Sequence, residues 1–172
     1  IDGVIRDVAS SYRLAIQETV NHFCNFKPSF EKIDNLKSEG LWNNDWDTSL
    51  EIIKRYKSAS PHFVEIPRRE KLVEVFTNFY FGGDPNGNNQ NWTGFIRNEK
   101  LLVNKSFFEK LTSNQFSWGF ISGAEPPSAR FVLETRLGLK NPPLIAMGEA
   151  PEKPDPSGLI KLSTQLAQKS LK

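Results

Sequence analysis

The sequence predicts an α/β protein in which a parallel-sheet core carries an inserted, all-helical unit. Two observations support this prediction. Between residues 10 and 81, apolar residues recur at helical spacing in successive segments with no strand between them. From Asn104 on, short apolar runs alternate with helical segments, which is the order typical of a parallel sheet with its crossover helices. A chain of 172 residues is long enough for one core with a modest insertion.

The N-terminal part begins with residues 1–5, predicted to be the end of an apolar strand with Asp2 at its tip. Four helices are predicted to follow, at residues 10–23, 29–36, 48–56 and 67–79. Ser29 fits an N-cap of the second helix, and Thr48-Ser49-Leu50-Glu51 fits a capping box for the third. Pro67 suits the first turn of the fourth helix, and Gly82 suits its end. Four helices without an intervening strand form an all-helical unit.

The C-terminal part follows a loop from Gly82 to Trp92 that is rich in Gly, Asn, Asp and Pro. Helix, strand, helix, strand and helix are then predicted at residues 106–111, 116–121, 128–137, 144–147 and 155 onward. Ser106 begins a second capping box, and Asp155-Pro156 fits an N-cap with proline after it. The whole pattern predicts a Rossmann-like core formed by residues 1–8 and 100–172, with a helical cap formed by residues 9–99.

Three polar signals follow the three predicted strands: Asp2, Ser122-Gly123 and Lys153-Pro154. Since ligands of doubly wound sheets bind at the carboxyl ends of strands, these positions are expected to share one edge. Their chemistry suits phosphoryl transfer. Asp2 could act as general acid and base beside a nucleophilic carboxylate. The Ser122 hydroxyl and backbone N–H groups at Gly123 could hold a phosphate, while Lys153 and a hard divalent cation balance its charge.

These positions also carry a family resemblance. They resemble the first three motifs of the haloacid dehalogenase superfamily, in its phosphatase-rich branch, subfamily I, which has a helical cap after the first motif. The matching segments are Asp2-Gly3-Val4, Phe120-Ile121-Ser122-Gly123 and Lys153-Pro154-Asp155-Pro156. One largely uncharacterised subgroup is similar in two further places, which are residues 2–8 with Ser11-Tyr12-Arg13, and Asn43-Asn44-Asp45-Trp46 in the cap. The resemblance extends over nearly the whole chain.

The resemblance implies roles for individual residues. Asp2 would be the general acid and base, and would also bind Mg²⁺ through its backbone carbonyl. Ser122 with Gly123 would bind the phosphate, and Lys153 would be the third-motif lysine. The family's nucleophilic aspartate lies two residues before Asp2, and its acidic fourth motif would follow Lys172. Both lie outside this sequence, so the chain by itself is expected to be inactive and its parent protein to be longer.

The cap residues Asn43, Asn44, Asp45 and Trp46 have two interpretations. They could line the cap face over the site, or they could form a helix-connecting loop that a buried tryptophan anchors. The sequence pattern leaves both open.

The expected function is a magnesium-dependent phosphatase that acts on a small phosphorylated metabolite through an aspartyl-phosphate. Carbon–halogen hydrolysis is an alternative, but it needs no acid at Asp2. A phosphomutase and a non-catalytic binding or regulatory module are further alternatives. A net charge of +2 gives no electrostatic reason to expect nucleic acid, and no apolar run approaches the ~18 residues of a membrane span. The lone Cys24 suits a reducing compartment, so a cytoplasmic location is expected, with an organelle as the alternative. The oligomeric state stays open.

Overall fold

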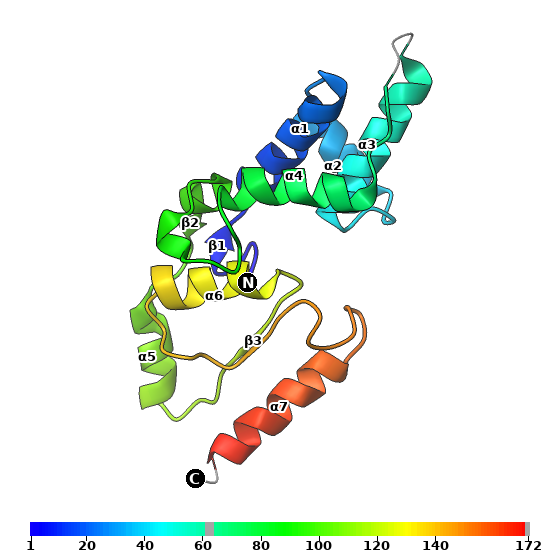
Figure 1. Ribbon diagram of the computed structural model, residues 1–172. Coiled ribbons are helices and arrows are strands. Elements are labelled where there is room, and N and C mark those ends of the chain that lie inside the picture. The colour runs from blue at the N-terminus through cyan, green and yellow to red at the C-terminus, as the bar shows by residue number, and fades with distance from the viewer. Residues whose placement is uncertain (61–63, 171–172) are drawn as a thin grey trace. The chain divides into compact units, whose positions relative to one another are not determined.

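The computed structural model describes residues 1–60 and 64–170, so that Lys172, after which a fourth motif was expected, lies outside the described residues. The chain divides into two compact units (Figure 1). Unit 1 comprises Ile1–Val8 and the chain from Lys100 on, and unit 2 comprises Ala9–Glu99. Each unit is described by itself.

Helices are the regular secondary structure found among the described residues of unit 2. Its main helices are α1 (Ser11–Cys24), α2 (Phe30–Ser38), α3 (Asp45–Ala59) and α4 (Arg69–Phe81), followed by the short 3₁₀ turns η1 (Asn89–Asn91) and η2 (Phe95–Asn98). The central helix is α1, which packs against both α3 and α4. The buried core consists of aliphatic and aromatic side chains from all four helices, among them Ile16, Val20, Ile33, Ile53, Leu72 and Phe76. Burial of these side chains, and not helix propensity alone, holds helices of this length together.

Asparagine caps two helices where the sequence pattern indicated Ser or Thr. The α3 helix begins at Asp45, because Asn44 Oδ1 accepts hydrogen bonds from the backbone N–H groups of Trp46 (2.9 Å) and Asp47 (3.3 Å). The capping box predicted at Thr48 is therefore wrong, and the Thr48 hydroxyl instead donates backward to the carbonyl of Trp42 at 2.8 Å. An asparagine is as good a cap as threonine, so the first suitable residue along the chain starts the helix.

The same competition occurs at α5 (Lys105–Ser113) in unit 1. Asn104 Oδ1 accepts from the backbone N–H of Phe107 and from the hydroxyl of Ser106, so the capping box predicted at Ser106 is also wrong. The Ser29 cap is confirmed, since its hydroxyl accepts from the backbone N–H of Lys32 at 3.2 Å. Asp155 Oδ1 likewise accepts from the backbone N–H of Ser157, the first residue of the last helix.

The loop after α4 is closed by its own hydrogen bonds. Gly82 ends the helix as predicted, with a left-handed backbone conformation (φ +66°). A side chain at Gly82 would meet the backbone nitrogen of Gly94 at 2.2 Å, so the close approach of these two segments requires glycine. The Gly94 N–H donates to the carbonyl of Phe81, and the Trp92 indole N–H donates to the carbonyl of Asp84.

Unit 1 contains two short sheets within its described residues. The strands β1 (Arg6–Asp7) and β2 (Lys100–Leu101) pair antiparallel, whereas β3 (Phe120–Ile121) and β4 (Leu144–Ile145) pair parallel. Between β3 and β4 lie α6 (Pro126–Arg130) and a π-helical continuation, η3 (Phe131–Arg136), and α7 (Ser157–Ser170) follows β4. The predicted parallel pair joined by a helix is thus confirmed, with shorter strands than the apolar runs indicated. The helix begins at Pro126, because two prolines suit its first turn.

The predicted strand at residues 1–5 is wrong. This segment is a tight turn, in which the N–H of Ile5 donates to the carbonyl of Ile1 (2.7 Å) and the N–H of Gly3 donates to the carbonyl of Arg6 (2.9 Å). Gly3 has φ +70°, a left-handed conformation that interrupts an extended strand. Asp2 takes part only in an isolated bridge with Arg6 and does not follow a strand of the β3–β4 sheet.

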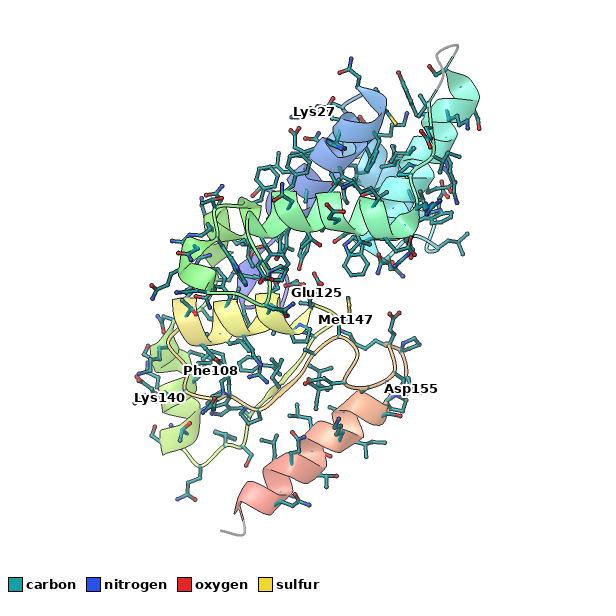
Figure 2. The ribbon with its side chains drawn as sticks, viewed as in Figure 1. Lys27, Phe108, Glu125, Lys140, Met147 and Asp155 are labelled. Atoms are coloured by element: carbon teal, nitrogen blue, oxygen red, sulfur yellow. The ribbon has the colours of Figure 1, made fainter. Side chains whose placement is uncertain are left out.

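An aromatic cluster anchors α5 to β3. The ring of Phe108, labelled in Figure 2, lies 5.0 Å from Trp118 and 5.4 Å from Phe120, measured between ring centroids. Phe108 and Phe120 are buried. Phe120 stands two residues before Ser122, so this packing holds in place the strand that leads into the candidate site.

Candidate active site

Asp2 lies at the tip of the N-terminal turn and keeps part of its side chain accessible. The side chain is 31% exposed, and its Oδ1 atom accepts a hydrogen bond from the Nε–H of Arg6 at 2.7 Å. Within the described residues, the other carboxylate oxygen, Oδ2, accepts no hydrogen bond. Asp2 is therefore a carboxylate that one ion pair orients and that still reaches solvent.

Ser122 and Gly123 follow β3 directly. The backbone N–H of Ser122 donates to the carbonyl of Ile145 in β4, so the parallel pairing positions the residue. Its buried hydroxyl accepts a hydrogen bond from the backbone N–H of Ala124 at 3.1 Å, which leaves the hydroxyl proton for another acceptor. The N–H of Gly123 makes no hydrogen bond within the described part of the chain, and no atom lies within 4 Å of where a side chain would be. This turn can accept an anion.

Lys153 lies in the loop between β4 and α7. The residue is exposed, and in the part of the chain that the structure describes its ammonium makes no hydrogen bond or ion pair. The loop is held at both ends. Glu149 Oε2 accepts from the backbone N–H of Ala146 (2.7 Å), and the Lys161 ammonium donates to the carbonyl of Glu149 (2.8 Å). At the other end, hydrogen bonds from Ser157 lower the pKa of Asp155.

The charges of Asp2 and Lys153 both influence the amino group of Ile1 in unit 1. The pKa of the Ile1 amino group is lowered, first by burial, while the charge of Asp2 raises it and the charges of Lys153 and Arg6 lower it. Because screened charges act mainly within about 10 Å, Asp2, Arg6 and Lys153 lie in the neighbourhood of Ile1. The sequence predicted that Asp2 and Lys153 follow strands of the same sheet. In the structure Lys153 follows β4, whereas Asp2 belongs to a turn.

Glu125 is a residue that the sequence interpretation missed. It stands three residues after Ser122 at the start of α6, and Figure 2 labels it beside Met147, whose backbone N–H donates to the carbonyl of Ala124. Burial raises the pKa of the Glu125 carboxyl. Its side chain makes no hydrogen bond within the described residues. One signal in the sequence could have identified it: Glu125 is an acidic residue three positions after Ser122, the serine of the candidate phosphate site.

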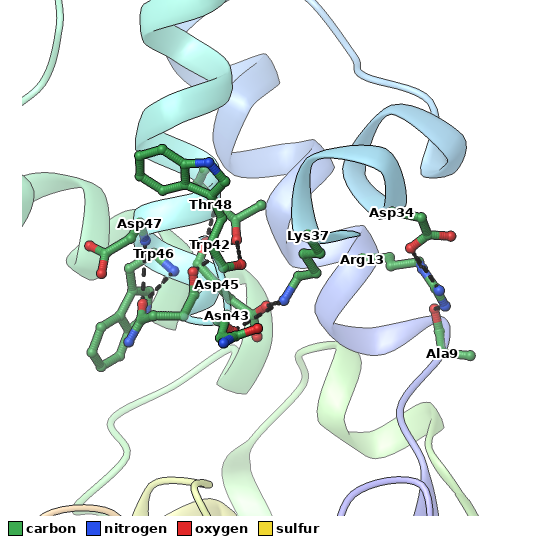
Figure 3. A network of polar contacts seen from close by, with 12 residues as sticks. Ala9, Arg13, Asp34, Lys37, Trp42, Asn43, Asp45, Trp46, Asp47 and Thr48 are labelled. Carbon is green, nitrogen blue, oxygen red and sulfur yellow. Dashed lines mark hydrogen bonds and ion pairs between the residues drawn. The ribbon is translucent and has the colours of Figure 1, made fainter. Parts of the chain in front are cut away.

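The four cap residues singled out in the sequence lie at the start of α3 or just before it, and Figure 3 labels three of them, Asn43, Asp45 and Trp46. Asn44 caps the helix, and Asp45 forms an ion pair with Lys37, whose ammonium also donates to the carbonyl of Asn43. The guanidinium of Arg69 lies 5.3 Å from the centre of the Trp46 ring, a cation–π contact. These contacts agree with a helix-connecting segment. A role toward substrate stays a prediction.

A magnesium site is not complete in the residues that the structure describes. Mg²⁺ favours six oxygen ligands, several of them waters. Asp2 offers a carboxylate and a backbone carbonyl, and no group of three or more His, Cys, Asp or Glu side chains that could hold a metal ion occurs among the described residues. Likewise, none of the helices in the described ranges is long and apolar enough to cross a membrane.

Comparison with known proteins gives two similarities. The chain matches no protein-family model. It is 28% identical over 163 residues to an imidazoleglycerol-phosphate dehydratase of Phytophthora nicotianae, a match that covers 93% of this chain and 34% of that protein. The chain thus spans about a third of the length of this curated relative. Among solved structures it is similar to phosphatase Tt82 from Thermococcus thioreducens, with a TM-score of 0.67 and 23% identity over 94% of this chain and 75% of that one. The chain therefore has the mixed α/β fold of a phosphatase of known structure.

Proposed function

We propose that this chain belongs to a magnesium-dependent phosphoric monoester hydrolase of the haloacid dehalogenase superfamily. The observation that carries the proposal is the arrangement in unit 1. Asp2 is a partly exposed carboxylate, and Lys153 is exposed and unpaired among the described residues. The Ser122-Gly123 turn follows β3, which pairs in parallel with β4, the strand that precedes Lys153. A carboxylate, a cation and an anion-binding turn are the groups that phosphoryl transfer requires.

In the proposed reaction each residue has one task. The Ser122 hydroxyl and the Gly123 N–H donate hydrogen bonds to the phosphate oxygens, and Lys153 neutralises negative charge that builds up on them. Asp2 gives a proton to the leaving oxygen and later takes one from the attacking water. The family resemblance supplies the nucleophile as an aspartate two residues before Asp2, so that a covalent aspartyl-phosphate divides the reaction into two steps.

The similarity to a solved phosphatase supports phosphate chemistry over carbon–halogen hydrolysis. The solved neighbour is named a phosphatase, and the curated relative is named for a substrate that is itself a phosphate ester. Together they favour a small phosphorylated metabolite as the substrate. Carbon–halogen hydrolysis, a phosphomutase and a non-catalytic module are the competing functions. Asp2 speaks against the first, because a halide leaves without a proton.

The proposal extends to architecture, cofactor and location. Unit 1 would be a Rossmann-like core and unit 2 its cap, where Asn43, Asn44, Asp45 and Trp46 are candidates for contact with the substrate. Bound Mg²⁺ would supply positive charge at the phosphate, with Asp2 among its ligands. Asp2 alone is too small a ligand set, so the proposed site needs further oxygen ligands. We propose a cytoplasmic location.

The test is hydrolysis of phosphate monoesters by the full-length protein that carries this chain. We expect Mg²⁺-dependent release of phosphate from an alkyl phosphate and from p-nitrophenyl phosphate. Asp2→Asn should lower kcat/KM for the alkyl phosphate by about 10²–10⁴-fold, the usual contribution of a general acid. Asp34→Asn, an exposed carboxylate of unit 2 that pairs with Arg13, is the control and should retain activity.

Two results would contradict the proposal. The first is a folded full-length protein that releases no phosphate from a broad panel of monoesters with Mg²⁺ present, which would favour the non-catalytic module. The second is an Asp2→Asn variant as active as the Asp34→Asn control. Activity that persists in a strong chelator of divalent cations would contradict only the choice of Mg²⁺.

A further inference from the structure

Arg6 is a fully buried arginine that stands four residues after Asp2. Its side chain is 0% exposed. The guanidinium donates from Nε to Asp2 Oδ1 at 2.7 Å and from its terminal nitrogen Nη2 to the hydroxyl of Ser128 at 2.9 Å. Ser128 is itself fully buried and lies in α6. A buried charge is costly unless it is paired and hydrogen-bonded, so both contacts matter to Arg6.

The backbone of Arg6 is fixed as firmly as its side chain. Arg6 is the register partner of Leu101 in the β1–β2 pair, and its carbonyl accepts from the N–H of Gly3 within the N-terminal turn. The guanidinium therefore projects from a position that a sheet and a turn both hold. Its planar fork can donate in two directions at once, which a lysine ammonium on a flexible stem does less well.

We propose that Arg6 is a positioning residue for Asp2 and couples it to the phosphate-binding turn through Ser128. This inference rests on the proposed function of Asp2 as general acid and base. Arg6 engages Oδ1 and leaves Oδ2 for proton exchange with the substrate. Ser128 stands in the helix that directly follows Ser122-Gly123, so one guanidinium ties the acid to the segment that would bind the phosphate.

A purely structural role for Arg6 makes a different kinetic prediction. Loss of folding or of overall site geometry would slow every substrate alike. Loss of a correctly placed general acid slows substrates in proportion to how much their leaving group needs a proton. An alkyl phosphate needs that proton, whereas p-nitrophenolate leaves as a stable anion. The ratio of the two kcat/KM values therefore reports on Asp2 and not on the amount of folded enzyme.

The experiment compares three variants of the full-length protein. Arg6→Lys keeps the charge but loses the fork, and Ser128→Ala removes the second partner. Arg130→Lys is the matched control, because Arg130 is exposed and pairs with Glu134 on the same stretch of helix. We expect Arg6→Lys to lower kcat/KM for the alkyl phosphate by about 10-fold to 100-fold, with a much smaller loss for p-nitrophenyl phosphate.

A double variant provides the second readout. If Arg6 acts through Asp2, then Arg6→Lys should cost almost nothing further for the alkyl phosphate in the Asp2→Asn background. Equal losses for both substrates, additive losses in the double variant, or a result indistinguishable from Arg130→Lys would overturn the inference.

Amide hydrogen exchange separates this inference from the proposed function, because it needs no activity. In Arg6→Lys and in Ser128→Ala, the amides of residues 3–6 should exchange faster than in the wild type, while those of α7 should not change. If the wild type proves to have no phosphatase activity but this difference appears, Arg6 positions Asp2 for some other task and the proposed function alone fails. Unchanged exchange at residues 3–6 would overturn the inference itself.

Discussion

Arg6 in unit 1 and Glu99 in unit 2 are both buried charges close in sequence to a boundary between the units, and their described hydrogen bonds lead to different kinds of group. Arg6 pairs with a carboxylate, Asp2, that is 31% exposed. Glu99 is 1% exposed, and its Oε1 atom accepts from the hydroxyls of Ser11 (2.6 Å) and Tyr80 (3.1 Å), both buried as well. The first network ends at a group that can meet a ligand. In the second, the hydroxyls that donate to Glu99 are themselves buried.

The difference helps to distinguish a hydrogen-bond network that orients a reactive group from one that only stabilises the fold. Burial, charge and short hydrogen bonds occur in both, so none of these features identifies function by itself. The discriminating feature is whether the network reaches an accessible, chemically able group. We therefore expect perturbation of Glu99 to change stability alone, and perturbation of Arg6 to change the behaviour of Asp2.

The largest stability effect is expected for Glu99→Ala. The substitution empties a buried site and leaves the hydroxyls of Ser11 and Tyr80 without this acceptor, which should lower the free energy of unfolding by about 3 kcal/mol. Urea titration measures the change. The ratio of kcat/KM values for the alkyl phosphate and p-nitrophenyl phosphate should stay at the wild-type value. A shift in that ratio as large as that of Arg6→Lys would break the comparison.

The two serines offer the most closely matched pair. Ser11 and Ser128 are both buried and both hydrogen-bond to a buried charged side chain, so alanine at either position should cost about 2 kcal/mol of stability. Only Ser128→Ala should also speed amide exchange at residues 3–6. Mass spectrometry of the exchanged protein can compare the two variants directly. Faster exchange there in Ser11→Ala would show that the readout follows stability in general.

A smaller effect is expected for Tyr80→Phe. This variant loses the hydrogen bond to Glu99 but keeps the ring that stacks on Tyr12 at 4.6 Å between centroids. The free energy of unfolding should fall by about 1 kcal/mol, less than in Ser11→Ala, because the Tyr80 hydrogen bond is longer. Thermal unfolding checks the order of the two variants. The reverse order would mean that the hydrogen bond from Tyr80 to Glu99 stabilises the protein more than its length of 3.1 Å indicates.

The smallest effect concerns Glu125, a partly buried acid without a hydrogen-bonding partner among the described residues. Burial raises its pKa above the ordinary value of 4.5, so the folded state holds this proton more tightly than the unfolded state does. Stability should then fall as the pH rises from the ordinary value through the raised one. Glu125→Gln removes this dependence, so it should be more stable than the wild type at pH 7 and equal to it below about pH 4. Melting temperatures of the wild type and Glu125→Gln, measured across pH 3–8, test this prediction. Equal melting temperatures of the two proteins at pH 7 would contradict it.

The sequence predicted the features that depend on local patterns. The parallel pair β3–β4, the Ser29 cap and the end of α4 at Gly82 follow from apolar runs and from the preferences of single residues. The capping boxes failed at Thr48 and Ser106, because an asparagine stood earlier in each segment and competed for the same role.

The features that the sequence could not predict depend on contacts between distant residues. The apolar residues at positions 1–5 fit a strand, and only the left-handed conformation of Gly3 reveals the turn. Most arginines are exposed, and the burial of Arg6 leaves no local signal because its partner Ser128 is 122 positions away along the chain. The network around Asp2 was therefore invisible in the sequence, although Asp2 itself was not.

The antiparallel pairing of β1 with β2 has a consequence for how unit 2 is attached. Asp7 is the register partner of Lys100, so the residues that lead into and out of the inserted unit are neighbours across one ladder. Antiparallel neighbours are what a two-residue turn normally joins. For unit 1, residues 9–99 are therefore topologically equivalent to the loop of a β-hairpin. The length of that loop can change without a change in the register of the two strands at its base.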